Sequence, residues 1–222
     1  MAVNDRRSGS SRSASARGSN KPMTDRVYEH VYSSIVNATL TCNDLLTETA
    51  LAGELGVSKA PVREALITLC DEKILQCIPR MGYRVLQISP QQLIRLGEAR
   101  IVLETSLLEK SWPELGEAQV EQLRALLERQ ISEIPRHPQI YDRWQGNILF
   151  HMTLAGFHDN EYLLEALRRI LRDCARGATQ CFLGYQRQSQ EAHYHERIVE
   201  ALLRRDYESA RQSLIGDIRE LM

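Results

Sequence analysis

Four polar residues in the second half of the chain occupy helical positions where the spacing of apolar neighbours predicts an inward-facing surface. They are Asn147, His151, His195 and Asp217. They come from three expected helices, over residues 139–158, 188–204 and 207–221. Polar groups in an apolar interior need partners. Two imidazoles, a carboxylate and an amide oxygen can together bind a divalent metal. A core network of hydrogen bonds without metal satisfies the same groups.

Arg100 adds a positive charge to this inward-facing set. It lies in the middle of an apolar stripe on a helix expected from residue 90 to 111, and a buried guanidinium requires an anion. Glu104, one turn later, can supply that anion, and so can the carboxylate of a bound small molecule. His158 lies two turns beyond His151 on the same side and near a helix end, where it can line a pocket. Arg100 and a metal together would suit a small organic or sugar acid.

A second set of chemical groups lies in the first third of the chain. Lys59 and Arg63 stand opposite the apolar stripe at the N-terminal end of an expected helix, directly after Ser58. Arginine and lysine suit guanine O6 and N7, and a serine hydroxyl can donate to phosphate. Arg80 and Arg84 fall in an expected hairpin. Alone, such a basic pair is a solvated helix face, but its place in the predicted elements favours contact with DNA.

The elements that position this second set form a winged helix-turn-helix in the predicted order. We expect Thr24 to cap a first helix, Thr47 a short second helix and Ser58 a third. Two β-type runs, over residues 74–78 and 83–88, then predict a hairpin that serves as the wing.

From about residue 90 onward the sequence shows only helical periodicity. Its breaks predict about six helices with short connections, hence an antiparallel all-α bundle. The predicted fold class is therefore mainly α, with an N-terminal winged helix-turn-helix. The predicted domains are a disordered basic tail over residues 1–22, the DNA-binding domain over 23–88 and the helical domain over 89–222.

The segment from Leu46 to Leu66, LTETALAGELGVSKAPVREAL, resembles the winged-helix signature of the GntR family of bacterial transcription regulators. Its PVREAL core is the most specific part. The sequence MGYRV at residues 81–85 resembles the wing of that family. The helical remainder is similar to the FadR-type effector-binding domain called FCD, so the resemblance covers about residues 24–221. It implies a dimeric, sequence-specific DNA-binding regulator, a repressor, whose helical domain binds an effector.

Carried over residue by residue, the resemblance implies DNA contacts from Ser58, Lys59, Arg63 and the wing-tip Gly82. Thr49 matches a position where relatives use a basic residue against phosphate. Lys59 stands where arginine is common, which keeps the charge but loses the bidentate fork of a guanidinium.

The resemblance also bears on the inward-facing set. The run from Asn147 to His151 resembles the Asp-x-x-x-His step of metal-binding FCD domains, and His195 resembles their second histidine motif. Asp217 stands where a third histidine is expected. The ligand set of the family is one Asp and three His, whereas the corresponding residues here are Asn, His, His and Asp. The two imidazoles favour zinc or nickel. The resemblance implies that Arg100 receives a carboxylate-bearing effector near this metal.

Composition and charge limit the remaining possibilities. The chain of 222 residues is 43% hydrophobic and 26% charged, and it contains no apolar run of about 18 residues that would span a membrane. Five cysteines without a CxxC pair, and no secretory signal, predict a reduced, cytoplasmic protein. The formal net charge is −1, so positive charge must be concentrated locally to attract DNA. The tail holds five basic residues and one acidic residue; it is a solvated tail, an arm against DNA phosphates, or a segment upstream of an alternative start at Met23.

The alternative function is a metal-dependent enzyme in the bundle with an accessory DNA-binding domain. We find no nucleophile motif and no Gly-rich phosphate loop in the sequence, which favours the regulator.

Overall fold

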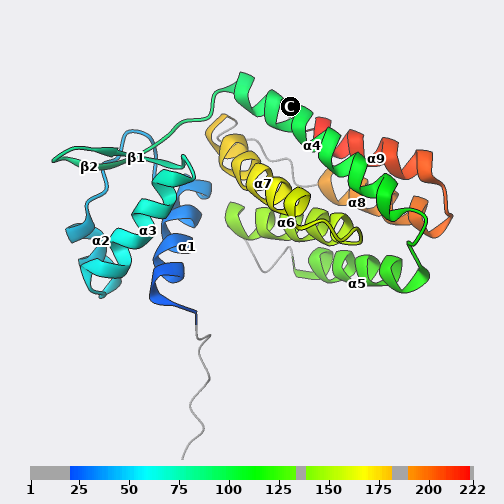
Figure 1. Ribbon diagram of the computed structural model, residues 1–222, viewed down its shortest axis with the longest axis horizontal. Helices are drawn as coiled ribbons and strands as arrows, with labels where there is room; N and C mark the ends of the chain where they lie inside the picture. The colour runs from blue at the N-terminus through cyan, green and yellow to red at the C-terminus, as the bar shows by residue number, and fades with distance from the viewer. Residues whose placement is uncertain (1–20, 134–138, 182–189, 221–222) are drawn as a thin grey trace, which may run out of the picture.

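The computed structural model describes residues 21–133, 139–181 and 190–220. Nearly all of the predicted tail lies outside these ranges. Figure 1 shows two parts, one containing α1–α3 with the hairpin and the other containing α4–α9. The elements are α1 (Met23–Val36), α2 (Glu48–Leu55), α3 (Lys59–Asp71), β1 (Leu75–Ile78), β2 (Gly82–Val85), α4 (Pro90–Ser111), α5 (Glu117–Glu133), α6 (Ile140–Ala155), α7 (Glu161–Cys181), α8 (Gln190–Leu203) and α9 (Tyr207–Arg219). The mainly helical fold, with a winged helix-turn-helix and six further helices, is as predicted.

Local signals explain some of the helix boundaries. Thr47 caps α2 by accepting a hydrogen bond from a backbone N–H in the first turn, and Gly56 ends that helix in the left-handed region at φ 64°. Ser58 precedes α3 as predicted, although its side chain makes no capping hydrogen bond. The prediction for Thr24 is wrong, because α1 already begins one residue earlier. The Thr24 hydroxyl instead donates to Glu64 and joins α1 to α3.

The hairpin is shorter than predicted, because β2 ends at Val85 rather than at residue 88. Its turn is closed by a hydrogen bond from the Met81 N–H to the Ile78 carbonyl. Tyr83 and Leu46 exchange backbone hydrogen bonds of 2.8 and 2.9 Å, which fasten the wing to the segment before α2. Gly82 is required here, because its φ is 135° and a Cβ would lie 2.1 Å from the Leu46 carbonyl oxygen.

The apolar core of residues 23–88 extends into the helical bundle. The apolar side chains of α1, α3 and the hairpin form one cluster together with Trp144 of α6 and Ala175 of α7. Arg172 of α7 lies over the rings of Tyr28 and Tyr32, 4.7 and 4.8 Å from their centroids. Two domains that are separate along the chain are therefore packed into one body, with α7 beside α1 (Figure 1).

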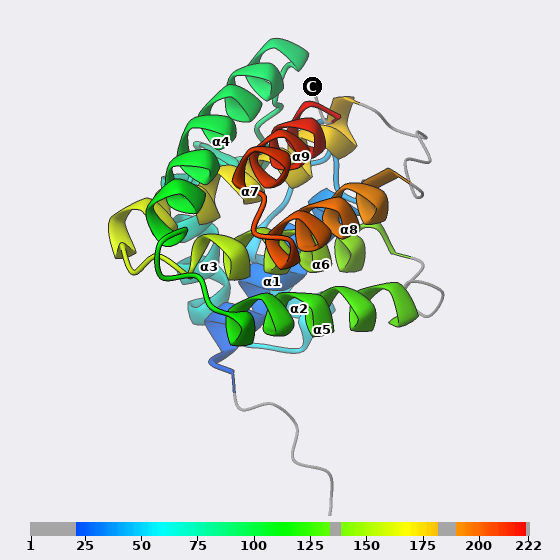
Figure 2. The same cartoon turned by 90° about the vertical axis from the view of Figure 1, so that its right-hand side faces the viewer.

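The six helices α4–α9 form the bundle that was predicted. Helix α4 packs against α7 and α9, α8 packs against α9, and α5 packs against α8 and α6 (Figure 2). A large apolar cluster fills the space between α5, α6, α8 and α9. Among the helices in the described ranges, none has both the length and the apolar character needed to cross a membrane.

Candidate functional site

Polar side chains from four helices meet inside the bundle. Their exposed fractions are all 4% or less, which confirms that the predicted positions face inward. The members are Arg100 and Glu104 of α4, Asn147 and His151 of α6, His195 of α8 and Asp217 of α9. We call these six residues the buried cluster. In both α4 and α6 the two members lie one helical turn apart, so each helix presents a pair of side chains to the same interior space.

His151, His195 and Asp217 bring three metal-ligating atoms together. His151 Nε2 lies 3.0 Å from Asp217 Oδ2 and 3.4 Å from His195 Nε2. His195 Nε2 lies 3.7 Å from Asp217 Oδ1. In a tetrahedral zinc site with bonds of 2.0–2.1 Å, neighbouring ligand atoms are about 3.3 Å apart. The three side chains are therefore spaced like the ligands of one small cation.

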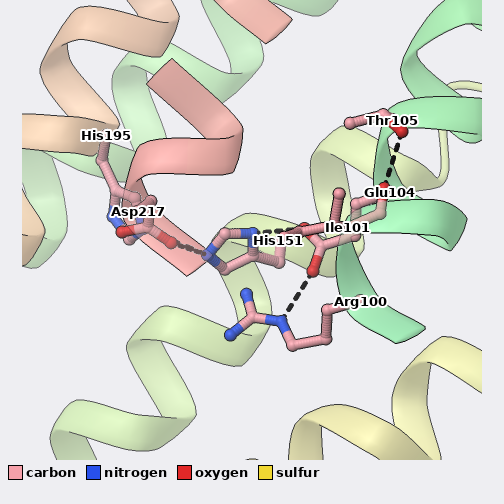
Figure 3. A network of polar contacts seen from close by, with 7 residues as sticks. All are labelled: Arg100, Ile101, Glu104, Thr105, His151, His195 and Asp217. Atoms are coloured by element: carbon pink, nitrogen blue, oxygen red, sulfur yellow. Dashed lines mark hydrogen bonds and ion pairs between the residues drawn. The ribbon is translucent and has the colours of Figure 1, made fainter. Parts of the chain in front are cut away.

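Glu104 connects this triad to Arg100. One carboxylate oxygen accepts a hydrogen bond from Arg100 Nε at 2.8 Å, and the other lies 2.6 Å from His151 Nδ1 (Figure 3). His151 Nδ1–H donates to the carboxylate in this arrangement, so Nε2 is the ring nitrogen turned toward Asp217. Metal-binding histidines commonly have such a carboxylate behind them, which fixes the ring and the tautomer.

Burial and neighbouring charges shift the pKa values of the cluster in opposite directions. Burial alone would raise the pKa of Glu104, but Arg100 and His151 offset it and hold that pKa below its ordinary value. Burial favours neutral His151, yet Glu104 and Asp217 raise its pKa to about 9. His195 has no comparably close carboxylate, and burial lowers its pKa to about 4. Burial would raise the pKa of Asp217, but the hydrogen bond and charge of His151 lower it to about 2.

Several polar atoms beside the triad have no hydrogen-bond partner among the described residues. Among them are the nitrogen and oxygen of the Asn147 amide and the two terminal nitrogens of Arg100. Figure 3 shows the terminal nitrogens of Arg100 turned away from Glu104. Leaving such groups buried and unpaired costs about 1–3 kcal/mol each, and more for a charged group. These atoms therefore mark a place where a polar ligand or water is needed.

His158 does not join the buried cluster. It lies in the turn after α6, seven residues beyond His151, and is half-buried. Among the described residues, no hydrogen bond or ion pair joins the His158 side chain to the buried cluster. Its predicted role in lining a pocket stays a prediction.

The side chains predicted to contact DNA lie on α2, α3 and the hairpin. Thr49 lies in the first turn of α2, Ser58 and Lys59 at the start of α3, and Arg63 one turn later. All four are exposed, as are Arg80 and Arg84 in the wing, while Gly82 is half-buried. The structure thus leaves the predicted DNA-binding residues accessible on α2, α3 and the hairpin.

Sequence reasoning missed two acidic residues that organise these sites. Glu104 was considered only as a partner of Arg100, yet it also contacts His151 across two helices. Glu48 was not singled out, yet it accepts hydrogen bonds from Arg63 and from the Tyr83 hydroxyl. An acid at i+4 from a buried arginine was the available signal for Glu104. Glu48 and Arg63 are 15 residues apart, and no helical spacing connects them.

The sequence matches two protein families. Residues 23–85 match the family described as bacterial regulatory proteins, gntR family, and residues 95–219 match the FCD domain. The chain is 29% identical over 133 residues to the gluconate operon transcriptional repressor of Bacillus licheniformis, a match covering 59% of this chain and 53% of that protein. It is 26% identical over 192 residues to an uncharacterized HTH-type transcriptional regulator, YdhC, of Bacillus subtilis, covering 85% of this chain and 84% of that one.

Solved structures support the fold. The chain is similar to McbR/YncC of E. coli, with a TM-score of 0.74 and 20% identity, covering 90% of this chain and 95% of that chain. It is also similar to a GntR-type regulator from Rhodococcus sp. RHA1, with a TM-score of 0.70 and 21% identity, covering 89% and 94%. The match to the gluconate repressor spans only about half the length of that protein.

Proposed function

Because the chain belongs to the GntR family of bacterial transcription regulators and carries an FCD domain, we propose that it is a repressor whose affinity for operator DNA changes when a small carboxylate-bearing effector binds at the buried cluster. The observation that carries the effector site is the set of unpartnered polar atoms of Arg100 and Asn147 beside the His151–His195–Asp217 triad. Family and relatives identify a transcription regulator rather than the metal-dependent enzyme considered as the alternative.

We propose that a divalent metal, zinc or nickel, is held by His151, His195 and Asp217. The spacing of the three ligand atoms and the carboxylate behind His151 support this assignment. Asn147 stands one turn before His151, where its amide oxygen can serve as a weak fourth ligand. A metal held by the other three ligands alone would have an open coordination position, which either this amide oxygen or an oxygen atom of the effector can fill.

Arg100 is proposed to bind the effector carboxylate. Its Nε is occupied by Glu104, whereas Nη1 and Nη2 have no described partner, so a pair of donors is available for a bidentate contact. The guanidinium stays charged, because burial disfavours the charge but Glu104 raises the pKa above its ordinary value. A small organic or sugar acid has the matching chemistry, and two of the relatives are named for a gluconate operon.

The protein is proposed to act as a homodimer on double-stranded DNA. Two recognition helices about one DNA turn apart gain affinity and specificity over one. Helix α4 lies at the outside of the bundle in both views (Figures 1 and 2) and exposes the apolar side chains of Ile94 and Val102. Such side chains on an outer helix suit a contact between copies. Size-exclusion chromatography with light scattering tests this, and a monomer at micromolar concentration would contradict it.

The function is tested by footprinting on DNA that the full-length protein selects from a random-sequence library. We expect a protected site that is lost on adding one member of a panel of organic and sugar acids. Arg100→Met leaves Glu104 with His151 as its remaining partner. Once circular dichroism shows that this variant is folded, it should retain the footprint but no longer respond to the acid. Arg124→Met, which removes an exposed arginine of α5, should respond like the unmodified protein. Selection of no sequence would overturn DNA recognition, and an unchanged response in Arg100→Met would overturn the effector site.

The metal is tested by elemental analysis of protein purified without a histidine tag. We expect near-stoichiometric zinc or nickel that is lost in His151→Ala. His193→Ala is the matched control, because His193 is exposed on the same helix as His195. A protein without metal, or one whose metal survives His151→Ala, would contradict the assignment.

A further inference from the structure

Glu48 joins the three elements that carry the predicted DNA contacts. It is the first residue of α2, and its carboxylate accepts hydrogen bonds from Arg63 of α3 and from the hydroxyl of Tyr83 of β2. The distances are 3.0 Å from Arg63 Nε to Oε1, 2.8 Å from Arg63 Nη2 to Oε2 and 3.2 Å from the Tyr83 hydroxyl to Oε1. One carboxylate thus connects α2 to the recognition helix α3 and to β2 of the wing.

This contact uses one edge of the Arg63 guanidinium. A guanidinium has five N–H donors in a planar fork, and adjacent pairs form its two bidentate edges. Both nitrogens that donate to Glu48 belong to the edge made by Nε and Nη2. The other edge, made by Nη1 and the outer hydrogen of Nη2, remains turned away from the carboxylate. The Arg63 side chain is 62% exposed, so this outer edge is accessible to DNA.

We infer that Glu48 is a positioning residue for DNA recognition, which holds Arg63 so that only its outer edge meets a guanine. A guanidinium restrained in this way is already oriented before DNA arrives, so less side-chain freedom is lost on binding. The carboxylate also neutralises the charge of Arg63, so this arginine contributes to base discrimination more than to general attraction by phosphates. The inference rests on the proposed DNA-binding function and adds a residue that was assigned no role in it.

Two other roles of Glu48 predict different effects of its removal on DNA binding. An acidic side chain close to DNA repels phosphates, so if Glu48 did nothing else, its removal would strengthen binding to every sequence equally. If Glu48 only held the fold together, its removal would weaken binding to every sequence equally. Of the three roles, only positioning predicts that the ratio of specific to non-specific affinity falls.

The experiment measures both affinities of the full-length protein. The probes are the duplex that the unmodified protein selects from a random library and a scrambled duplex of the same length and composition. For Glu48→Ala we expect the ratio of specific to non-specific affinity to fall at least about tenfold, the size of one lost base contact. Non-specific affinity should stay equal or rise, with a salt dependence steeper by about one counterion because Arg63 is no longer neutralised.

Three further variants make the result specific to the Arg63 contact. Glu54→Ala removes an equal charge from the same helix, where Glu54 pairs with His30, and should leave the affinity ratio unchanged. Glu48→Gln keeps the shape of the side chain but removes its charge, and like Glu48→Ala it should lower the ratio of specific to non-specific affinity. In an Arg63→Ala background, Glu48→Ala should cause no further loss of ratio, because the two residues act as a unit.

The inference is overturned if Glu48→Ala and Glu48→Gln leave the affinity ratio unchanged while the unmodified protein binds its selected duplex specifically. Equal losses from Glu48→Ala with and without Arg63 would also overturn it. If the unmodified protein selects no sequence, the proposed DNA-binding function itself fails, and that outcome is recognised before any variant is made.

Discussion

Replacing Glu104 with glutamine should destabilise the bundle severely, because it removes the anion that neutralises a fully buried guanidinium. Arg100 is 0% exposed and its Nε donates to Glu104, whereas its two terminal nitrogens have no partner among the described residues. Breaking a buried ion pair by removing one partner costs about 3–5 kcal/mol. That is a large share of the 5–15 kcal/mol by which folded proteins are commonly stable.

The assay is urea unfolding followed by tryptophan fluorescence, which reports on Trp112 after α4 and Trp144 of α6. Glu121→Gln is the matched control, because Glu121 pairs with Arg124 on one helix just as Glu104 pairs with Arg100, but at the surface. We expect the control to leave the unfolding midpoint almost unchanged, since exposed ion pairs contribute little.

A double variant separates the buried charge from other effects of the substitution. Arg100→Met/Glu104→Gln removes the Arg100 guanidinium together with its anion, so it should be more stable than Glu104→Gln alone. The reasoning is refuted if Glu104→Gln costs no more than the surface control, or if the double variant is less stable than the single one.

A change of pH and three substitutions give expected outcomes of different kinds. In isothermal titration, the affinity for zinc should rise about tenfold per pH unit between pH 6 and 8, because zinc binding must release the proton of His151, whose pKa is raised to about 9. An affinity that does not change with pH would contradict this expectation. The control variant His193→Ala should show the same pH dependence as the unmodified protein. Gly82→Ala should lower the free energy of unfolding by more than about 1 kcal/mol, since the added Cβ would meet a backbone carbonyl oxygen at 2.1 Å. Gly53→Ala has nothing within 4 Å of its new Cβ and should stabilise α2 by about 0.5–1 kcal/mol; equal effects of the two on thermal unfolding would be inconsistent with this account. Trp144→Ala should cost about 3–5 kcal/mol and shift the unfolding of both parts of the chain together, as seen by hydrogen exchange, whereas a shift confined to α4–α9 would argue against the shared core.

Helical periodicity predicted the elements well because each helix buries one continuous stripe. The spacing of Asn147 and His151 placed both on the inner face of α6, and the isolated polar positions His195 and Asp217 were placed correctly on α8 and α9. These residues are informative because a polar group in an apolar stripe requires a reason. The start of α1 was misplaced at Thr24, because a single capping residue is a weak signal without the geometry of its hydrogen bond.

Contacts between elements could not be predicted in the same way. Glu104 follows Arg100 by one turn, which explains the ion pair within α4, but its second contact depends on how α4 crosses α6. The pairing of Glu48 with Arg63 depends on the angle between α2 and α3. Neither angle is encoded in the spacing of residues along one helix, so both acids were recognised only in three dimensions.

The shared core of α1, α6 and α7 has a consequence for how such a protein could be rebuilt from parts. Trp144 packs with the apolar core of residues 23–88, and His151 of the buried cluster follows it by two turns on the same helix. A chimaera that joined residues 23–88 to an unrelated sensor would keep the packing of α1 against α3 but lose its contacts with α6 and α7. It would also remove the helix that connects the two sites. We therefore expect such a chimaera to be less stable than the parent protein unless the new sensor replaces the contacts that Trp144 and Arg172 make with residues 23–88.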